Sequence, residues 1–327
     1  MNFFLICYLL HRAYCGLVRD IPPDELDANV ELSEEAFEDL FEKTPITDPV
    51  ELERHRQRLA EVEEEVKEIN MEYLEGKKTW FEKIDEFSDL PLDEFLAERT
   101  GLIDGYARGL IDSDAADEMD PVSEKYFDTF RYSRSTTPAN YSSVDLGYVT
   151  GVKDQKTCES CVIFSTIAAL EVCIKKLTGD EVDYSEQQLL DCGYGKYGAN
   201  GCYRAQSHSY LQTLYNSRMG LAHESTYPYR GTRGTCRSVL DNYNRGAMVT
   251  GAHFSYQGDE DLMEKTVAEL GAVSTSLAAD SDDFITYKGG VYDGDCSNNR
   301  NHAVTVVGYG TTESGKKYWL IKNSWYI

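Results

Sequence analysis

Basic residues are scarce in this chain, and long hydrophobic runs are missing from most of it. The 327 residues include 32 Lys and Arg against 57 Asp and Glu, which gives a formal net charge of -25. Binding to phosphates requires clustered Lys and Arg, so this balance argues against a nucleic-acid partner. After the N-terminus, no stretch is long and apolar enough to span a membrane, and there is no internal repeat. The sequence therefore predicts a protein with neither a nucleic-acid nor a membrane partner.

The acidic residues are concentrated in the N-terminal half. Residues 21–120 contain 32 acidic and 10 basic residues, whereas residues 136–327 contain 22 and 17. Most single acidic residues in such a run belong to a solvated surface. The hydrophobic fraction of 41% is enough for a sizeable core, and the length suits two or three compact units. The chain is therefore expected to fold into more than one part.

A short apolar run, residues 3–10, lies near the N-terminus. It is too short to cross a bilayer and is typical of a secretory signal, which we predict over residues 1–18; a buried N-terminal helix is the alternative. Nine cysteines are many for a cytosolic protein. In a secreted or lysosomal protein they are expected to form disulfides.

A long amphipathic helix is predicted to begin at Asp48. Asp48 can cap it, Pro49 suits its first position, and Glu51 stands where a capping box needs an acid. One apolar stripe then follows, and Gly76 ends the helix. The stripe consists of Leu52, Leu59, Val62, Val66, Ile69 and Tyr73.

Residues 104–137 are acidic, are punctuated by Asp, Ser and Pro, and have no clear apolar period, so they are predicted to be an exposed linker that proteases can cut. Beyond residue 138 two helices are predicted, Cys161–Leu177, which Gly179 closes, and 259–270. Strands are predicted at 303–307 and 318–321. Helices followed by strands indicate an α+β domain.

Cys161 stands at the start of an apolar helix, where unpaired backbone N–H groups and the helix dipole favour a thiolate. A thiolate nucleophile needs a His to share its proton and a third group to orient that His. Alone, Cys158-x-x-Cys161 could also be a zinc or redox motif. However, no second ligand pair stands at zinc spacing and no thioredoxin-like pattern surrounds it.

Three motifs in order resemble those of papain-like cysteine peptidases such as the cathepsin L-like enzymes. They are the segments 152–165 (VKDQKTCESCVIFS), 301–310 (NHAVTVVGYG) and 318–325 (YWLIKNSW). The separation of 141 residues between Cys161 and His302 agrees with the family spacing of about 130–150. The resemblance covers nearly all of residues 138–327. It implies a two-lobed α+β fold, with a helical lobe and an antiparallel β-barrel-like lobe, preceded by an α-helical propeptide.

The resemblance assigns roles to five residues. Cys161 is expected to be the nucleophile, His302 the general base and acid, and Asn323 the group that orients His302. The Gln155 side chain and the Cys161 backbone N–H are expected to form the oxyanion hole, and Trp325 to shield the Asn323–His302 hydrogen bond. The resemblance implies peptide hydrolysis by a monomer acting on protein or peptide substrates, without a cofactor or metal.

The remaining cysteines and the N-terminal half also match the family. The resemblance implies the disulfides Cys158–Cys202 and Cys192–Cys236, whereas the partner expected for Cys296 would lie beyond the end of the sequence. Residues 19–103 resemble the inhibitory propeptide, which lies through the cleft in reverse. We expect protonation of its carboxylates at low pH to loosen its docking.

Several residues depart from the family pattern around the cleft. Glu159 replaces a Gly and is expected to raise the Cys161 pKa; Val162 replaces an aromatic residue. The stretch Tyr203-Arg204-Ala205 replaces Asn-Gly-Gly, so Arg204 is expected to be strained if that position needs a positive φ. Arg300 stands where an apolar pocket wall is usual and hints at tolerance for an acidic substrate residue.

The resemblance implies further sheet after Trp325, whereas this sequence ends at Ile327. A truncated product, a partial sequence and a reduced barrel are all compatible with that end. Three interpretations follow: an active peptidase zymogen, a papain-fold binding or inhibitory protein without turnover, and a fragment that does not fold stably. A glycosylation sequon at Asn140 would lie on the surface of a secreted protein.

Overall fold

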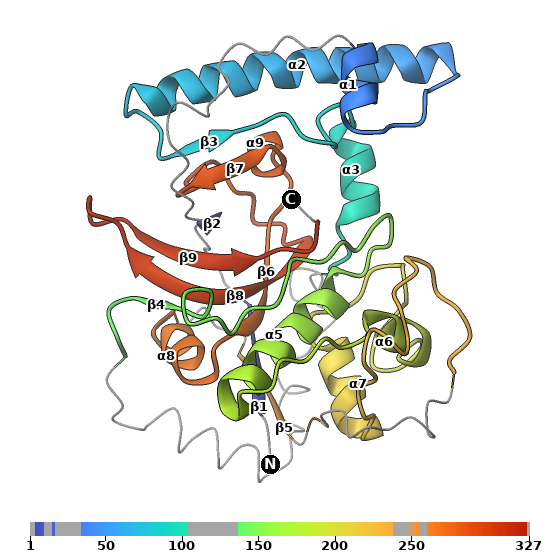
Figure 1. The fold of residues 1–327 in the computed structure, drawn as a ribbon, viewed down its shortest axis with the longest axis vertical. Helices are drawn as coiled ribbons and strands as arrows, with labels where there is room; N and C mark the ends of the chain where they lie inside the picture. The colour runs from blue at the N-terminus through green and yellow to red at the C-terminus, as the bar shows by residue number, and fades with distance from the viewer. Residues whose placement is uncertain are drawn as a thin grey trace. The chain divides into compact units, whose positions relative to one another are not determined.

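A computed structural model of the chain describes residues 4–9, 15–16, 34–103, 137–237, 249, 251–255 and 260–325 (Figure 1). The chain divides into two compact units. Unit 1 comprises Met1–Ala13, Glu98–Ala278 and Asn298–Tyr326, and unit 2 comprises Tyr14–Ala97, Ala279–Ser297 and Ile327. Nearly all of the predicted acidic linker lies outside the described residues.

The sheet of unit 1 centres on β8, His302–Thr311, which runs antiparallel to β9, Lys317–Lys322, and to β6, Val273–Leu277. The turn between β8 and β9 closes at Gly315, whose φ of 85° suits glycine. The short β4, Tyr141–Ser142, also pairs antiparallel with β8. This hairpin matters for function because it carries His302 at one strand start and Asn323 just after the other strand's end.

Two more strands extend the sheet beyond β6. β1, Phe4–Leu9, pairs in parallel with both β6 and β5, Gly251–Ser255, so the order is β9–β8–β6–β1–β5. The described strands of unit 1 thus form an open sheet and not a closed barrel. Part of the predicted signal peptide is a strand here and not the helix of the alternative interpretation; its removal stays a prediction.

Helix α5, Cys161–Thr178, lies against β8 and forms the core of unit 1 (Figure 1). Every residue from Cys161 to Ile174 is buried, as expected for a helix that is apolar nearly all round. Gly179 ends it at a φ of 80°, as the sequence predicts. The other helices of unit 1 are α6, Glu186–Cys192, α7, Ser209–Ser217, and α8, Glu260–Leu270.

Unit 2 is built on α2, Pro49–Leu74, with α1, Glu34–Leu40, and the first part of α3, Leu92–Arg99. Asp48 caps α2 by accepting hydrogen bonds from the N–H groups of Val50 and Glu51. The middle of the predicted stripe is buried, whereas Leu52 and Tyr73 at its ends are half-buried. The short β2, Cys15–Gly16, also belongs to this unit.

Unit 2 joins two segments that lie far apart in the sequence. β3, Trp80–Glu82, pairs antiparallel with β7, Tyr287–Gly290, which follows α9, Asp282–Ile285 (Figure 1). The Thr79 carbonyl accepts a hydrogen bond from the Val291 N–H at 2.7 Å. Residues 279–297, within the segment predicted to be the peptidase domain, therefore form part of the unit that contains most of the predicted propeptide.

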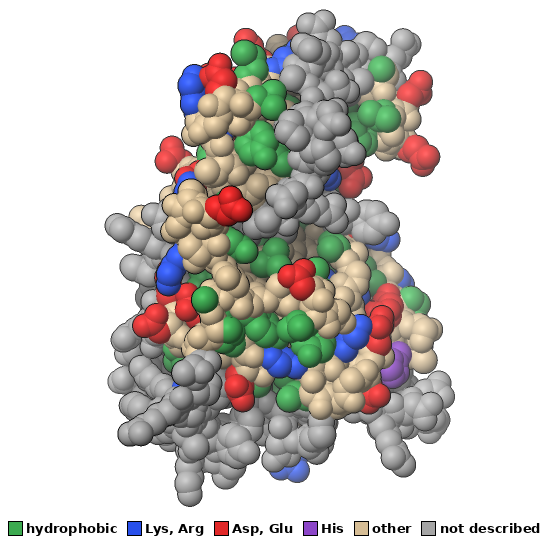
Figure 2. Space-filling view, turned by 60° about the vertical axis from the view of Figure 1, so that its left-hand side comes forward, with side chains coloured by type: hydrophobic (Ala, Val, Ile, Leu, Met, Phe, Trp, Pro, Cys, Tyr) green, Lys and Arg blue, Asp and Glu red, His purple; other side chains and the backbone are tan. Residues whose placement is uncertain are grey.

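Among the described side chains on the face drawn in Figure 2, acidic and basic residues are interspersed, and no single basic patch stands out. Among the described residues, none of the helices combines the length and the apolar character that crossing a membrane requires.

Asn70 provides a buried polar anchor for β3. Its side chain donates to the Glu82 carbonyl at 3.0 Å and accepts from the Glu82 N–H at 2.9 Å, and its exposed fraction is 1%. We predict that Asn70→Ala leaves the N–H and the carbonyl of Glu82 unsatisfied. The free energy needed to open β3 should then fall by about 1–3 kcal/mol. Faster hydrogen exchange of the Glu82 amide would report this loss. Gln57→Ala, which removes only an exposed hydrogen bond to Glu53, should leave that exchange unchanged.

Candidate active site

Cys161 is the first residue of α5 and is completely buried. The backbone N–H groups of Gly101, Val162 and Ala303 point to its Sγ atom. They surround the sulfur with the partial positive charges that would stabilise a thiolate. The preceding turn is held by the disulfide between Cys158 and Cys202.

His302 and Asn323 meet because β8 begins at His302 and the antiparallel strand β9 ends just before Asn323. His302 Nε2 lies 2.7 Å from Asn323 Oδ1, and the same oxygen accepts from the Ser324 N–H at 2.8 Å. An oxygen acceptor requires a proton on Nε2, which leaves the lone pair on Nδ1. His302 Nδ1 is buried without a hydrogen-bond partner, so it is available to a reacting group.

The Trp325 ring stacks on His302, with 4.4 Å between ring centroids and an interplanar angle of 29°. Both residues are at most 1% exposed. The ring therefore covers the imidazole and keeps water from the His302–Asn323 hydrogen bond.

Gln155 is fixed by hydrogen bonds on both sides of its amide. Its Oε1 accepts from Ser324 Oγ at 2.7 Å, and its Nε2 donates to the carbonyl oxygens of Cys158 and Arg99. The Gln155 N–H also donates to the Ser324 carbonyl at 2.9 Å. The donor expected in the oxyanion hole is thus positioned by the chain just after β9.

Residues 99–103, called segment 99–103 below, pass directly over Cys161. The Ala205 N–H donates to the Gly101 carbonyl at 2.7 Å, and the Ala205 carbonyl accepts from the Ile103 N–H at 2.8 Å. The Leu102 N–H donates to the Asn301 carbonyl at 2.9 Å. Leu102 is buried in the core with Cys161 and Ala205. The segment thus uses the backbone groups that a bound peptide would need.

Glycine is required where segment 99–103 crosses Cys161. A Cβ atom at Gly101 would overlap the Glu159 carbonyl group. The close approach also brings the Gly101 N–H to the Cys161 sulfur. The segment therefore seals the site tightly at this point.

Burial keeps the Cys161 thiol and the His302 imidazole neutral while segment 99–103 covers them. It raises the Cys161 thiol pKa to about 11, despite the three N–H groups around the sulfur. Burial also lowers the His302 pKa to about 4, partly offset by the Asn323 hydrogen bond. A neutral thiol beside a neutral imidazole is a poor nucleophile.

Glu159 contributes only a little to the raised pKa of Cys161. Its effect has the expected direction, but Glu159 forms an ion pair with Arg204, with 3.6 Å between Oε2 and Nε. Burial raises the Glu159 pKa, while Arg204 opposes that shift. Arg204 has a φ of 44°, the left-handed conformation in which a non-glycine residue is strained.

The other sequence-predicted cleft residues differ in exposure. Tyr203 is 71% exposed, Ala205 is buried and Arg300 is half-buried. Val162 is buried within α5. Only Ala205 among these four binds segment 99–103 through backbone hydrogen bonds.

The cysteines are arranged as the resemblance implies. Disulfides join Cys158 to Cys202 and Cys192 to Cys236. Cys173 is buried within α5 as a free thiol, and Cys296 is exposed. Asn140 is exposed, and its Oδ1 accepts a hydrogen bond from the Thr311 N–H at 2.9 Å.

A buried charged cluster supports the loop of Gln155, and the sequence analysis missed it. Lys153 Nζ lies 3.0 Å from Glu171 and 2.8 Å from Glu186, both almost fully buried carboxylates. Burial alone would lower the Lys153 pKa, but the two carboxylates hold it above its usual range. A Glu on the otherwise apolar helix α5 was the available signal for this cluster.

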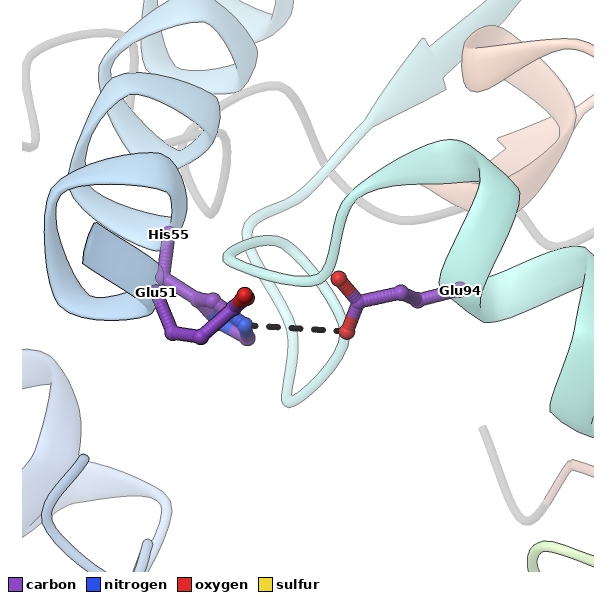
Figure 3. A group of neighbouring side chains, drawn as sticks. All are labelled: Glu51, His55 and Glu94. Carbon is purple, nitrogen blue, oxygen red and sulfur yellow. Dashed lines mark ion pairs between the residues drawn. The ribbon is translucent and has the colours of Figure 1, made fainter. Parts of the chain in front are cut away.

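One group of side chains in unit 2 has the composition of a metal site. Figure 3 shows Glu51 and His55, one turn apart on α2, facing Glu94 of α3. Arg54 already forms ion pairs with Glu94 and Glu51, and His55 Nδ1 lies 3.2 Å from Asp89. These contacts satisfy the cluster as an ion-pair network that links α2 to α3.

We predict that Gly101→Ala exposes Cys161, because the added methyl group overlaps the Glu159 backbone and must displace segment 99–103. Alkylation of Cys161 in the full chain at pH 7 should become at least about tenfold faster, since relieving such overlap costs 1–3 kcal/mol. Peptide mass spectrometry after timed labelling measures the rate. Gly151→Ala, where a Cβ meets open space, is the matched control. Equal rates in both variants would contradict the tight seal.

Comparison with known proteins agrees with this geometry. Residues 137–326 match the family model described as papain family cysteine protease. Mouse cathepsin S is 35% identical over 262 residues, covering 78% of this chain and 70% of its own length. Cathepsin L of Sarcophaga peregrina is 41% identical over 192 residues, covering 58% of this chain and 56% of its own length. The chain spans between 49% and 70% of the length of its curated relatives.

Solved proforms share the fold. The structure of digestive procathepsin L 3 from the larval midgut of Tenebrio molitor has a TM-score of 0.71 at 28% identity, covering 89% of this chain and 87% of that one. The proform of the ragweed pollen allergen Amb a 11, a cysteine protease, has a TM-score of 0.71 at 26% identity, covering 94% and 88%. With the Cys161, His302 and Asn323 arrangement, these matches show that the chain belongs to the papain family of cysteine proteases.

Proposed function

We propose that the chain is a cathepsin L- or S-like cysteine endopeptidase zymogen that hydrolyses peptide bonds through a thioester. The observation that carries this proposal is the unpartnered Nδ1 atom of His302. Its other nitrogen is fixed by Asn323, and the buried Cys161 thiol lies at the helix start beside Ala303, the residue after His302. This is the arrangement of nucleophile, base and orienting group that acyl transfer requires.

The residues have distinct roles in this mechanism. The Cys161 thiolate attacks the substrate carbonyl, and Gln155 Nε2 with the Cys161 N–H stabilises the resulting oxyanion. His302 then protonates the leaving amine, which breaks the peptide bond and leaves a thioester on Cys161. His302 next takes a proton from the attacking water, and hydrolysis releases the acid and restores the thiol. Asn323 keeps the imidazole in the required tautomer throughout.

Segment 99–103 keeps the zymogen latent in two ways. It occupies the backbone hydrogen-bonding groups of Ala205 and Asn301, and its chain runs in the direction opposite to that of a substrate. It also removes water from Cys161 and His302, which favours their neutral forms. Release of the segment lets water return, so that the thiol pKa falls, the imidazole pKa rises, and the thiolate–imidazolium pair can form.

The proposed organisation follows the sequence boundaries. Residues 1–18 would be a signal peptide, 19–103 the inhibitory propeptide, 104–137 the linker cut on activation, and 138–327 the peptidase domain. The two disulfides support a secreted or lysosomal location, because such bonds persist in oxidising compartments. Proteins or peptides would be the substrates.

To test the mechanism, the full chain is acidified to allow processing, and Cys161 alkylation is measured from pH 4 to pH 9. We expect fast labelling near pH 5 and hydrolysis of fluorogenic peptides. His302→Ala should remove the fast labelling and lower kcat/KM by at least about 100-fold, because the thiolate loses its counter-ion and the leaving amine its acid. Cys161→Ala identifies the labelled site.

Labelling only above about pH 8 in the processed chain, as for an ordinary thiol, would contradict the mechanism. Glu159 and the strained Arg204 would then support the second interpretation, a papain-fold binding protein without turnover. Absence of a cooperative unfolding transition would support the third, a fragment without a stable fold.

Protonation of three carboxyl groups in unit 2 should stabilise its fold. This is the opposite of the loosening at low pH that the sequence led us to expect. Burial, with the charges of Asp283 and Glu65, raises the Glu82 pKa to about 8. Burial raises the Asp85 pKa to about 6, although the Phe87 N–H and Lys288 favour its charged form. Burial and Asp283 also raise the Glu65 pKa, with Arg58 opposing. A carboxyl group whose pKa is higher in the folded state destabilises that state when it ionises.

We therefore predict that the packing of β3 on β7 becomes more stable as pH falls from 8 to about 6. Hydrogen-exchange protection of the Val291 amide, corrected for intrinsic exchange, measures this stability.

Glu82→Gln should flatten the rise in protection between pH 8 and 6, because glutamine does not ionise. Glu61→Gln, at an exposed position of α2, is the control and should keep the wild-type profile. A wild-type protection that falls steadily from pH 8 would show that acid loosening dominates over the whole range.

A further inference from the structure

Arg99 of segment 99–103 binds a specific carboxylate beside the catalytic residues. Its Nη1 atom lies 3.0 Å from Asp154 Oδ1, and its side chain is only 12% exposed. Its carbonyl oxygen accepts hydrogen bonds from Gln155 Nε2 at 3.1 Å and from Trp325 Nε1 at 3.2 Å. We propose that Asp154 forms a substrate subsite that selects Arg or Lys as the first residue after the scissile bond. This inference rests on the proposed peptidase function.

The side of the nucleophile on which Arg99 lies follows from the hydrogen bonds. Segment 99–103 extends in two directions from Gly101, whose N–H points to Cys161. Leu102 and Ile103 bind the edge formed by Ala205 and Asn301, whereas the Arg99 carbonyl binds Trp325, which stacks on His302.

His302 must protonate the leaving amine, so the part of a substrate that leaves lies toward His302 and Trp325. Arg99 therefore occupies the position of the leaving-group residue, and Leu102 lies on the acyl side. A subsite for a side chain is available whichever way the backbone runs. The reversed chain direction of the segment therefore does not change the assignment of Arg99 to the leaving-group side.

Asp154 is held ready for a cation. Its Oδ1 also accepts a hydrogen bond from the Lys156 N–H at 2.8 Å, and its backbone pairs with Trp325 in an isolated bridge. The carboxylate is 34% exposed even with Arg99 bound. A preorganised carboxylate loses little conformational freedom when it binds a guanidinium or ammonium group.

The charges on the two sides of Cys161 are balanced differently. On the acyl side, Glu159 has Arg204 as its partner, from the peptidase domain itself. On the leaving-group side, the cation partner of Asp154 comes from the segment that activation removes. Activation therefore frees Asp154 of this cation, and a basic substrate residue can take its place. For a partly exposed charged contact we expect a roughly five- to tenfold preference.

The experiment uses full-length chain activated by acid and titrated for reactive Cys161. Internally quenched peptides share one sequence and differ only in the first residue after the scissile bond: Arg, Lys, Ala or Glu. For wild type we expect kcat/KM to be roughly five- to tenfold higher for Arg than for Ala, and lowest for Glu. Asp154→Asn should abolish the difference between Arg and Ala, and Asp154→Glu should partly keep it.

Asp145→Asn, an exposed carboxylate on another loop, is the matched control and should keep the Arg preference. Thermal melting of each variant checks that it is folded. Equal kcat/KM for the four wild-type peptides, or an Arg preference that survives in Asp154→Asn, would overturn the proposal.

A chain that labels at Cys161 but hydrolyses none of the peptides would contradict the proposed function and not the subsite. The same peptides then serve as ligands that protect Cys161 from alkylation. Protection by the Arg peptide should exceed that by the Glu peptide at least fivefold and should lose this advantage in Asp154→Asn. Equal protection by both peptides would overturn the subsite.

Discussion

Exclusion of water from Cys161 and His302 is the constraint on which the rest of the site depends. Burial disfavours both the Cys161 thiolate and the His302 imidazolium, so in the proposed mechanism the two groups become reactive only when water returns. The scaffold supplies a fixed geometry through α5, β8 and the end of β9. Segment 99–103, which passes over the site, then determines the charge states of Cys161 and His302. In the proposed mechanism, latency is therefore an electrostatic property of a site that is already assembled.

Local sequence patterns were sufficient for the elements that carry the site. The apolar character of α5, its terminal Gly179 and the cap at Asp48 each depend on residues within one or two turns, so they could be predicted from the sequence. The three motifs around Cys161, His302 and Asn323 also predicted a site that the structure assembles from one helix and two strands. His302 begins one of those strands, and Asn323 follows the end of the other.

Non-local pairs were not predictable in the same way. Lys153 with Glu171 and Glu186, and Arg99 with Asp154, depend on which loops meet in three dimensions, and no periodicity reports that. The expected effect of Glu159 on Cys161 had the right sign, but the partner Arg204 was seen only as a strained residue. The parallel pairing of β1 was missed for a similar reason, because a short apolar run fits a signal peptide and a buried strand equally well.

The disulfide between Cys158 and Cys202 has a consequence for how this cleft can diversify. Cys158 stands three residues before the nucleophile, and Cys202 stands three residues before Ala205. The bond thus connects Cys161 to the backbone edge at Ala205 that binds segment 99–103, whatever side chains lie between. Glu159 and Arg204 occupy those intervening positions, and they can carry charge and even strain without changing the spacing. The disulfide fixes the backbone spacing of the cleft independently of these side chains, so mutation can change the charges in the cleft while the spacing is preserved.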